Sequence, residues 1–136
     1  AIWTGSRFIV WGGANRNTPL ADGAAYDPAA DSWTPLSIDN SPSARTGHVA
    51  IWTGAEMVIW SGLGSNGSLA TGAAFDPTAN TWRTLQNPGS PLTRDHGSAI
   101  WTGGEMLVFG GLSSGAPLAN LQRLNPQPAW HLYRKL

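Results

Sequence analysis

Two apolar runs separated by a short turn recur three times along the chain. Each recurrence begins with the pentapeptide Ala-Ile-Trp-Thr-Gly, at residues 1–5, 50–54 and 99–103. A second apolar run follows after a short step and ends near glycine, at residues 8–13, 57–62 and 106–111. The spacing between copies is 49 residues in both cases (50 − 1 and 99 − 50). Self-similarity at a fixed period of this length is typical of repeat architectures.

Each repeat is predicted to hold four short β-strands. The two apolar runs around a Gly-containing turn predict a hairpin. A small-residue strand ending at Tyr26, the turn Asp27-Pro28 and a strand around Trp33 complete the first repeat. Because the apolar runs are continuous, both faces of each sheet should be covered. No stretch sustains a helical period, and Gly or Pro interrupts the chain about every ten residues. Twelve such strands fit a propeller, whose blades are stacked four-stranded meanders.

The third repeat departs from the pattern near its end. Leu124-Asn125-Pro126 replaces the aromatic-Asp-Pro step, and Trp130 stands one residue early for the 49-residue period. Terminal repeats are often atypical because they cap or close an array. We therefore predict a single domain over residues 1–136, with blades at about 1–36, 47–85 and 96–136.

Composition excludes several classes of function. Charged residues make up 12% of the chain and the net charge is zero, so no basic patch indicates a nucleic-acid partner. Cysteine is absent, which excludes disulfides, thiolate metal sites and a cysteine nucleophile. No apolar run approaches the ~20 residues of a membrane-spanning helix. We expect no cofactor, no metal and no membrane span. Ala1 lies inside a repeat, so we also expect the chain to be processed or partial.

The repeats resemble the kelch motif, and more closely the bacterial kelch-type repeats that read WTG…MIVWGG…YDP…W. The period fits the ~50 residues of kelch better than the ~40–45 of WD40 blades. The matching residues are the glycine pairs Gly12-Gly13 and Gly110-Gly111 with the variant Ser61-Gly62, the aromatics Tyr26 and Phe75, the tryptophans Trp33 and Trp82, the arginines Arg45 and Arg94, and the histidines His48 and His96. The resemblance implies an all-β, kelch-type β-propeller of three four-stranded antiparallel blades. Because bacterial repeats of this type are often exported, it also implies an extracellular, periplasmic or cell-surface location.

Three blades leave two open blade faces lined by apolar side chains. Propellers typically close with ~4–8 blades, and soluble monomers rarely expose large apolar patches. We expect the open faces to be covered in one of three ways. The chain is a partial propeller whose other blades belong to a longer chain, or two copies form a six-bladed ring, or copies stack head to tail.

The strand order separates two kinds of loop. Short Thr-Gly and Asp/Asn-Pro turns should lie at one end of the blades. The longer loops 14–22, 63–71 and 112–120 and the connections 37–46 and 86–96 should lie at the other, and they differ between repeats. Function concentrates in variable loops on a rigid scaffold. The predicted ligand- or partner-binding residues are Asn15, Arg16, Asn17, Arg45, Asn66, Arg94, Asp95 and His96.

Several of these residues have a structural alternative. Arg45 and Arg94 could clamp an anionic ligand, but bracing of backbone carbonyls is favoured, since a guanidinium offers five donors. His48 and His96 could hold a metal with Asp95, but hydrogen bonding within the blade connections is favoured. The repeated aspartates are predicted to cap turns. The repeated tryptophans are predicted to be core residues.

The predicted function is a non-catalytic binding or scaffold module that presents its variable loops to a protein or glycan partner. One alternative is a structural accessory subunit of a larger complex or filament, with self-association or further blades covering the open faces. Another is a carbohydrate-active enzyme. The copper-radical chemistry of some kelch-fold oxidases is excluded, because it requires a Cys–Tyr crosslink. We predict no catalytic residues.

Overall fold

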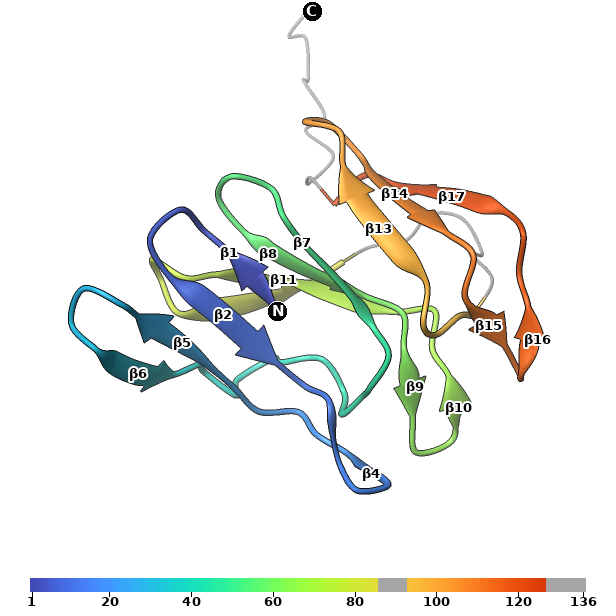
Figure 1. The fold of residues 1–136 in the computed structure, drawn as a ribbon, viewed down its shortest axis with the longest axis horizontal. Helices are drawn as coiled ribbons and strands as arrows, with labels where there is room; N and C mark the ends of the chain where they lie inside the picture. The colour runs from blue at the N-terminus through green and yellow to red at the C-terminus, as the bar shows by residue number, and fades with distance from the viewer. Residues whose placement is uncertain (86–92, 127–136) are drawn as a thin grey trace, which may run out of the picture.

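The computed structural model describes residues 1–85 and 93–126, and within them every regular element is a β-strand (Figure 1). Blade 1 has the strand order β1 (Ile2–Trp3), β2 (Phe8–Trp11), β5 (Gly23–Asp27) and β6 (Ser32–Pro35). Blade 2 consists of β7 (Val49–Trp52), β8 (Met57–Trp60), β11 (Gly72–Asp76) and β12 (Thr81–Thr84). Blade 3 shows β13 (Ser98–Trp101), β14 (Met106–Phe109) and β17 (Leu121–Leu124). All these strand pairs are antiparallel, which confirms the predicted blades of a partial propeller. The predicted fourth strand of blade 3, around Trp130, lies outside the described residues.

The short turns form as their residue types require. In the first turn the Thr4 hydroxyl accepts a hydrogen bond from the Arg7 backbone N–H at 2.9 Å, and Gly5 has a φ of 102°. A positive φ of this kind favours glycine. The Asp27 carboxylate caps the next turn by accepting from the Ala29 N–H at 2.9 Å, and Asp76 does the same for Thr78 at 2.8 Å. The predicted capping by both aspartates is therefore confirmed.

The loops between the second and third strands are more ordered than the sequence analysis expected. Each folds into a two-stranded hairpin, and Figure 1 shows these hairpins at one end of the blades. The pairs are β3 (Ala14–Asn15) with β4 (Thr18–Pro19), β9 (Leu63–Gly64) with β10 (Gly67–Ser68), and β15 (Leu112–Ser113) with β16 (Ala116–Pro117). Two-residue strands carry no hydrophobic alternation, which is why the sequence pattern gave no sign of them.

The packing between blades repeats with the same period as the sequence. We call the side of a blade that faces the next blade its forward face, and the opposite side its backward face. The forward face of blade 1 and the backward face of blade 2 form one core; the forward face of blade 2 and the backward face of blade 3 form a second. The first core joins Ile2, Ile9, Trp11, Ala25 and Leu36 to Met57, Ile59, Ala73, Phe75 and Trp82. The second joins Val49, Ile51, Val58, Trp60, Ala74 and Leu85 to Met106, Val108 and Leu124.

The first strands of the blades lie closest to one another. β7 lies beside both β1 and β13, so these strands are innermost and the later strands of each sheet are farther out (Figure 1). The antiparallel direction of successive strands fixes the end of the blade at which each hairpin and each turn emerges. In the part of the chain that the structure describes, no helix has the length and apolarity needed to cross a membrane.

Candidate functional site

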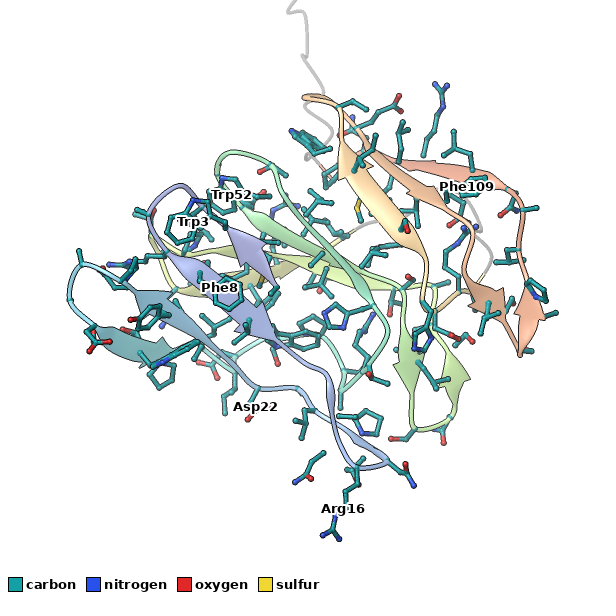
Figure 2. All side chains as sticks on the ribbon, in the orientation of Figure 1. Trp3, Phe8, Arg16, Asp22, Trp52 and Phe109 are labelled. Carbon is teal, nitrogen blue, oxygen red and sulfur yellow. The ribbon has the colours of Figure 1, made fainter. Side chains whose placement is uncertain are left out.

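The hairpin end of the blades brings together the variable segments that the strand order predicts there. Isolated β-bridges tie the blade connections to the hairpins, at Thr46 with Leu63, Leu69 with Arg94, and Asp95 with Leu112. Asn15, Arg16 and Asn17 form the exposed tip of β3–β4, and Asn66 is exposed at the tip of β9–β10. Figure 2 shows Arg16 at the outer end of its hairpin, pointing into solvent. We call this region, residues 14–19, 63–68, 93–96 and 112–117, the hairpin end.

Arg45 is buried beneath this surface rather than displayed on it. Its guanidinium donates to the carbonyl oxygens of Ser61 at 2.9 Å and Thr71 at 2.7 Å, and its Nε donates to the carbonyl oxygen of Ser43 at 3.0 Å. Burial lowers the pKa of Arg45 to about 10, so the group remains charged at neutral pH. These contacts fix the connection between blades 1 and 2 to the start and end of the β9–β10 loop.

Arg94 occupies the same position one repeat later and makes matching contacts. Its Nη1 donates to the carbonyl oxygen of Gly110 at 2.8 Å, and its Nη2 donates to Oδ1 of Asn120 at 2.9 Å. Gly110 and Asn120 lie 49 residues beyond Ser61 and Thr71. Both arginines therefore show the bracing that the sequence analysis favoured over an anion clamp. Ligand binding by either arginine stays a prediction.

Asp95 and His96 form a supported polar pair at the junction of blades 2 and 3. Asp95 is buried and accepts a hydrogen bond from the Ser68 hydroxyl at 2.6 Å; its other carboxylate oxygen lies 2.7 Å from Nδ1 of His96. The His96 side chain is 59% exposed, so its imidazole is held by Asp95 yet remains accessible. His96 has a φ of 53°, at the repeat position where Gly47 has a φ of 60°. Few residues other than glycine adopt this conformation, though His is among those enriched there.

His48 lies beneath the hairpin end, against the core residue Trp11, and not on the exposed surface. Its ring meets Trp11 edge-on, with 5.5 Å between ring centroids. Burial, the largest cause, lowers the pKa of His48 to about 4, so the imidazole is neutral at pH 7. Within residues 1–85 and 93–126, no three His, Cys, Asp or Glu side chains are arranged to hold a metal ion.

Acidification is expected to destabilise the fold through His48. The pKa of His48 is about 4 in the folded chain and about 6.5 in the unfolded chain. Between these two pH values the unfolded chain binds a proton at His48 and the folded chain does not. The stability contributed by neutral His48 is complete above pH 6.5. It is lost as the pH falls from about 6.5 to 4, by up to about 3 kcal/mol.

The measurement is urea unfolding of the wild type and of His48→Phe across this range. Because carboxylates titrate in both proteins, the His48 effect is the difference between the two profiles. Parallel profiles would contradict the prediction.

A hollow with a volume of about 1100 Å³ lies at the opposite end, among the short turns of blades 1 and 2. Its lining includes Thr4, Ser6, Arg7, Trp52, Glu56, Asp76 and Arg83. Within it, Arg83 donates to both carboxylate oxygens of Glu56, at 2.8 and 2.6 Å. This hollow could not be predicted from the sequence pattern, because it depends on how two blades pack. The sequence did carry one signal at this place, a change of charge at a position that recurs every 49 residues. This position is arginine in the first copy (Arg7) and glutamate in the other two (Glu56 and Glu105).

A family model described as the KLHDC2/KLHL20/DRC7 Kelch-repeats domain matches residues 1–133. The chain belongs to the kelch-repeat family. No curated protein matches it. Kelch repeats are typically non-catalytic modules for protein interaction, and membership of the family suggests a protein-interaction module.

Proposed function

We propose that this kelch chain is a non-catalytic binding module whose hairpin end contacts a protein partner. One observation carries the proposal: the scaffold repeats and is internally braced, whereas the exposed hairpin tips differ in each blade. The tips read Asn15-Arg16-Asn17 in blade 1, Ser65-Asn66 in blade 2 and Ser114-Gly115 in blade 3. Loops of this kind on a rigid scaffold are where binding residues concentrate.

The chemistry of the hairpin end suits a polar protein surface. The tips offer amide groups and one guanidinium, and the Asp95-supported imidazole of His96 adds a donor or acceptor near the blade connections. Arginine is enriched at protein interfaces, and its fork can bind a carboxylate with two hydrogen bonds. A glycan is the alternative partner, since the same amides could bind sugar hydroxyls. Export from the cell, which the resemblance to bacterial repeats implies, is part of this proposal.

Truncation of three side chains at the hairpin tips is expected to weaken ligand capture without loss of the fold. The wild-type chain is screened against a phage-displayed peptide library and a glycan array, and the best ligand is titrated. The variant Asn15→Ala/Arg16→Ala/Asn66→Ala should bind about tenfold more weakly or worse, because truncating interface anchors has effects of this size. Arg7→Ala, at the turn end, is the control that removes the same charge and should change affinity less than about twofold.

Three outcomes would count against the proposal. An equal loss with Arg7→Ala would move the site to the hollow at the turn end. Capture of glycans but no peptide would replace the protein partner by a glycan. Failure of both screens would remove the binding function.

A structural accessory subunit is the second candidate function, favoured by a separate observation. Large apolar side chains remain exposed on the backward face of blade 1 and the forward face of blade 3. Contiguous exposed apolar surface of this kind marks interaction sites. In this function the blade faces, and not the hairpins, carry the assembly.

A further inference from the structure

Asn66 is followed by Gly67 at the tip of the β9–β10 hairpin, and this is the one Asn-Gly dipeptide in the sequence. An asparagine loses its side-chain amide without an enzyme when the backbone nitrogen of the next residue attacks that side chain. A glycine in the next position favours this attack most, because it has no Cβ in the way and adopts unusual backbone conformations at little cost. The dipeptide is therefore a candidate modification site, whose reactivity depends on its structural setting.

The structure leaves this dipeptide open to the attack. Asn66 is exposed, and no hydrogen bond holds its side-chain amide in the part of the chain that the structure describes. Gly67 has a φ of 120°, and a Cβ there would meet no heavy atom within 4 Å. Figure 1 shows β9–β10 projecting beyond the four-stranded sheet of blade 2. Only two residue pairs join β9 to β10, and short exposed hairpins open at a low free-energy cost.

The same position in blade 1 lacks the reactive neighbour. Asn17 lies 49 residues before Asn66 and is likewise exposed at a hairpin tip, but Thr18 follows it. The β-branched threonine crowds its own backbone nitrogen and restricts the local conformation. In blade 3 the equivalent position is Gly115, so only blade 2 combines the asparagine with a following glycine.

Two other asparagines have side chains that are fixed by hydrogen bonds. Oδ1 of Asn80 accepts from the Ser37 backbone N–H at 2.9 Å, and Oδ1 of Asn120 accepts from the Arg94 guanidinium at 2.9 Å. An amide held in this way is hindered from turning toward the next backbone nitrogen. The fold thus protects these asparagines and leaves Asn66 free.

We propose that Asn66 is a site of spontaneous conversion to aspartate and isoaspartate. The Gly67 nitrogen forms a bond to Cγ of Asn66, and the bond from Cγ to the side-chain amide nitrogen breaks. That nitrogen leaves as ammonia with the proton that the Gly67 nitrogen loses, and a cyclic succinimide remains. Water then opens the ring: cleavage at Cγ gives aspartate, and cleavage at the Asn66 backbone carbonyl carbon gives isoaspartate. The net change consumes one water and releases one ammonia, with no oxidation or reduction.

The conversion adds a negative charge to the hairpin end. The tips of the three hairpins carry one charged side chain, Arg16, so an acid at Asn66 cancels their net positive charge. An acidic partner, which the Arg16 guanidinium favours, should then bind more weakly, because complementary charge is lost. This consequence rests on the proposed function, whereas the conversion itself does not.

Peptide mapping by mass spectrometry tests the conversion, on the 136-residue chain incubated at mildly alkaline pH. Asn66 should convert at least about tenfold faster than Asn17, a difference of ~1.4 kcal/mol in activation free energy. Thr18→Gly should bring Asn17 to a rate comparable to that of Asn66. Because the tip opens easily, Asn66 in the native chain should convert within about tenfold of its rate in urea.

Three results would overturn this modification site. The first is an equal rate at Asn66 and Asn17 in the wild type. The second is an Asn17 that stays unreactive in Thr18→Gly. The third is stronger protection of Asn66 by the fold than the tenfold limit.

A separate binding measurement tests the consequence for the partner. Asn66→Asp supplies the aspartate product in pure form, and the probe is the peptide that the phage screen selects, which we expect to be acidic. Asn66→Asp should bind this peptide about fivefold more weakly, and the difference should shrink at high salt. The control Gly104→Asp adds the same charge to an exposed turn at the opposite end, where a Cβ meets no atom within 4 Å, and should leave the affinity unchanged.

The two arms of the experiment fail separately. Equal affinities of Asn66→Asp and Gly104→Asp would overturn the effect on binding. If the wild type captures no peptide, the proposed function fails, and the mapping result still decides whether Asn66 is modified.

Discussion

Replacing Arg45 by alanine is expected to lower the free energy of unfolding by about 3 kcal/mol or more. The substitution leaves the buried carbonyl oxygen of Ser61 without its donor and empties the buried space that the guanidinium filled, whereas the Thr71 carbonyl oxygen keeps the Ser61 backbone N–H at 3.0 Å. Each buried polar group left without a partner costs about 1–3 kcal/mol, and the lost packing adds to this. Urea unfolding of wild type and variant, followed by tryptophan fluorescence, measures the difference.

Two companion variants separate bracing from the removal of a charge. Arg16→Ala also removes one guanidinium, but from an exposed hairpin tip, and should change stability by less than about 0.5 kcal/mol. Arg45→Lys keeps the charge but cannot reproduce the planar fork, so it should retain less than half of the lost stability. If Arg45→Ala unfolds like the wild type but captures the hairpin-end ligand poorly, the bracing role is wrong and the anion clamp is favoured.

The second large effect is expected at Trp82. Trp82→Ala removes a buried indole from the interface of blades 1 and 2, together with its contact to Trp11 and its hydrogen bond to the Ser37 carbonyl. Truncation of a buried tryptophan typically costs about 3–5 kcal/mol. Thermal and urea unfolding should both report this loss.

Trp33→Ala is the matched control, because it makes the same change at the same repeat position. Measured at a dilution where the chain is monomeric, it should cost less than about 1 kcal/mol, since its side chain is more than half exposed. At higher concentration the cost should grow if Trp33 is buried against a second copy, because assembly stabilises the folded state by mass action. Equal losses for the two variants in the monomer would show that the blade interface is not where the structure places it.

The sequence alone determined the features that depend on residues close together in the chain. The 49-residue repeat, the strand pairs within the blades and the short turns were predicted, because a turn is specified by local chemistry such as the Thr4 hydroxyl, the positive φ of Gly5 and the Asp27 cap. The kelch family was visible for the same reason, since its motif is a set of residues at fixed local spacing. The separation of hairpins from short turns followed from strand order.

Only the tertiary structure decided which copy of a repeated residue is buried. Trp33 and Trp82 are indistinguishable in the repeat, and their environments differ because one has a neighbouring blade and the other does not. The partners of Arg45 lie 16 and 26 residues away, and local spacing cannot specify such contacts. The hollow at the turn end likewise exists only once two blades pack together. Local chemistry specifies strands and turns, whereas the burial of a residue depends on which blade packs beside it.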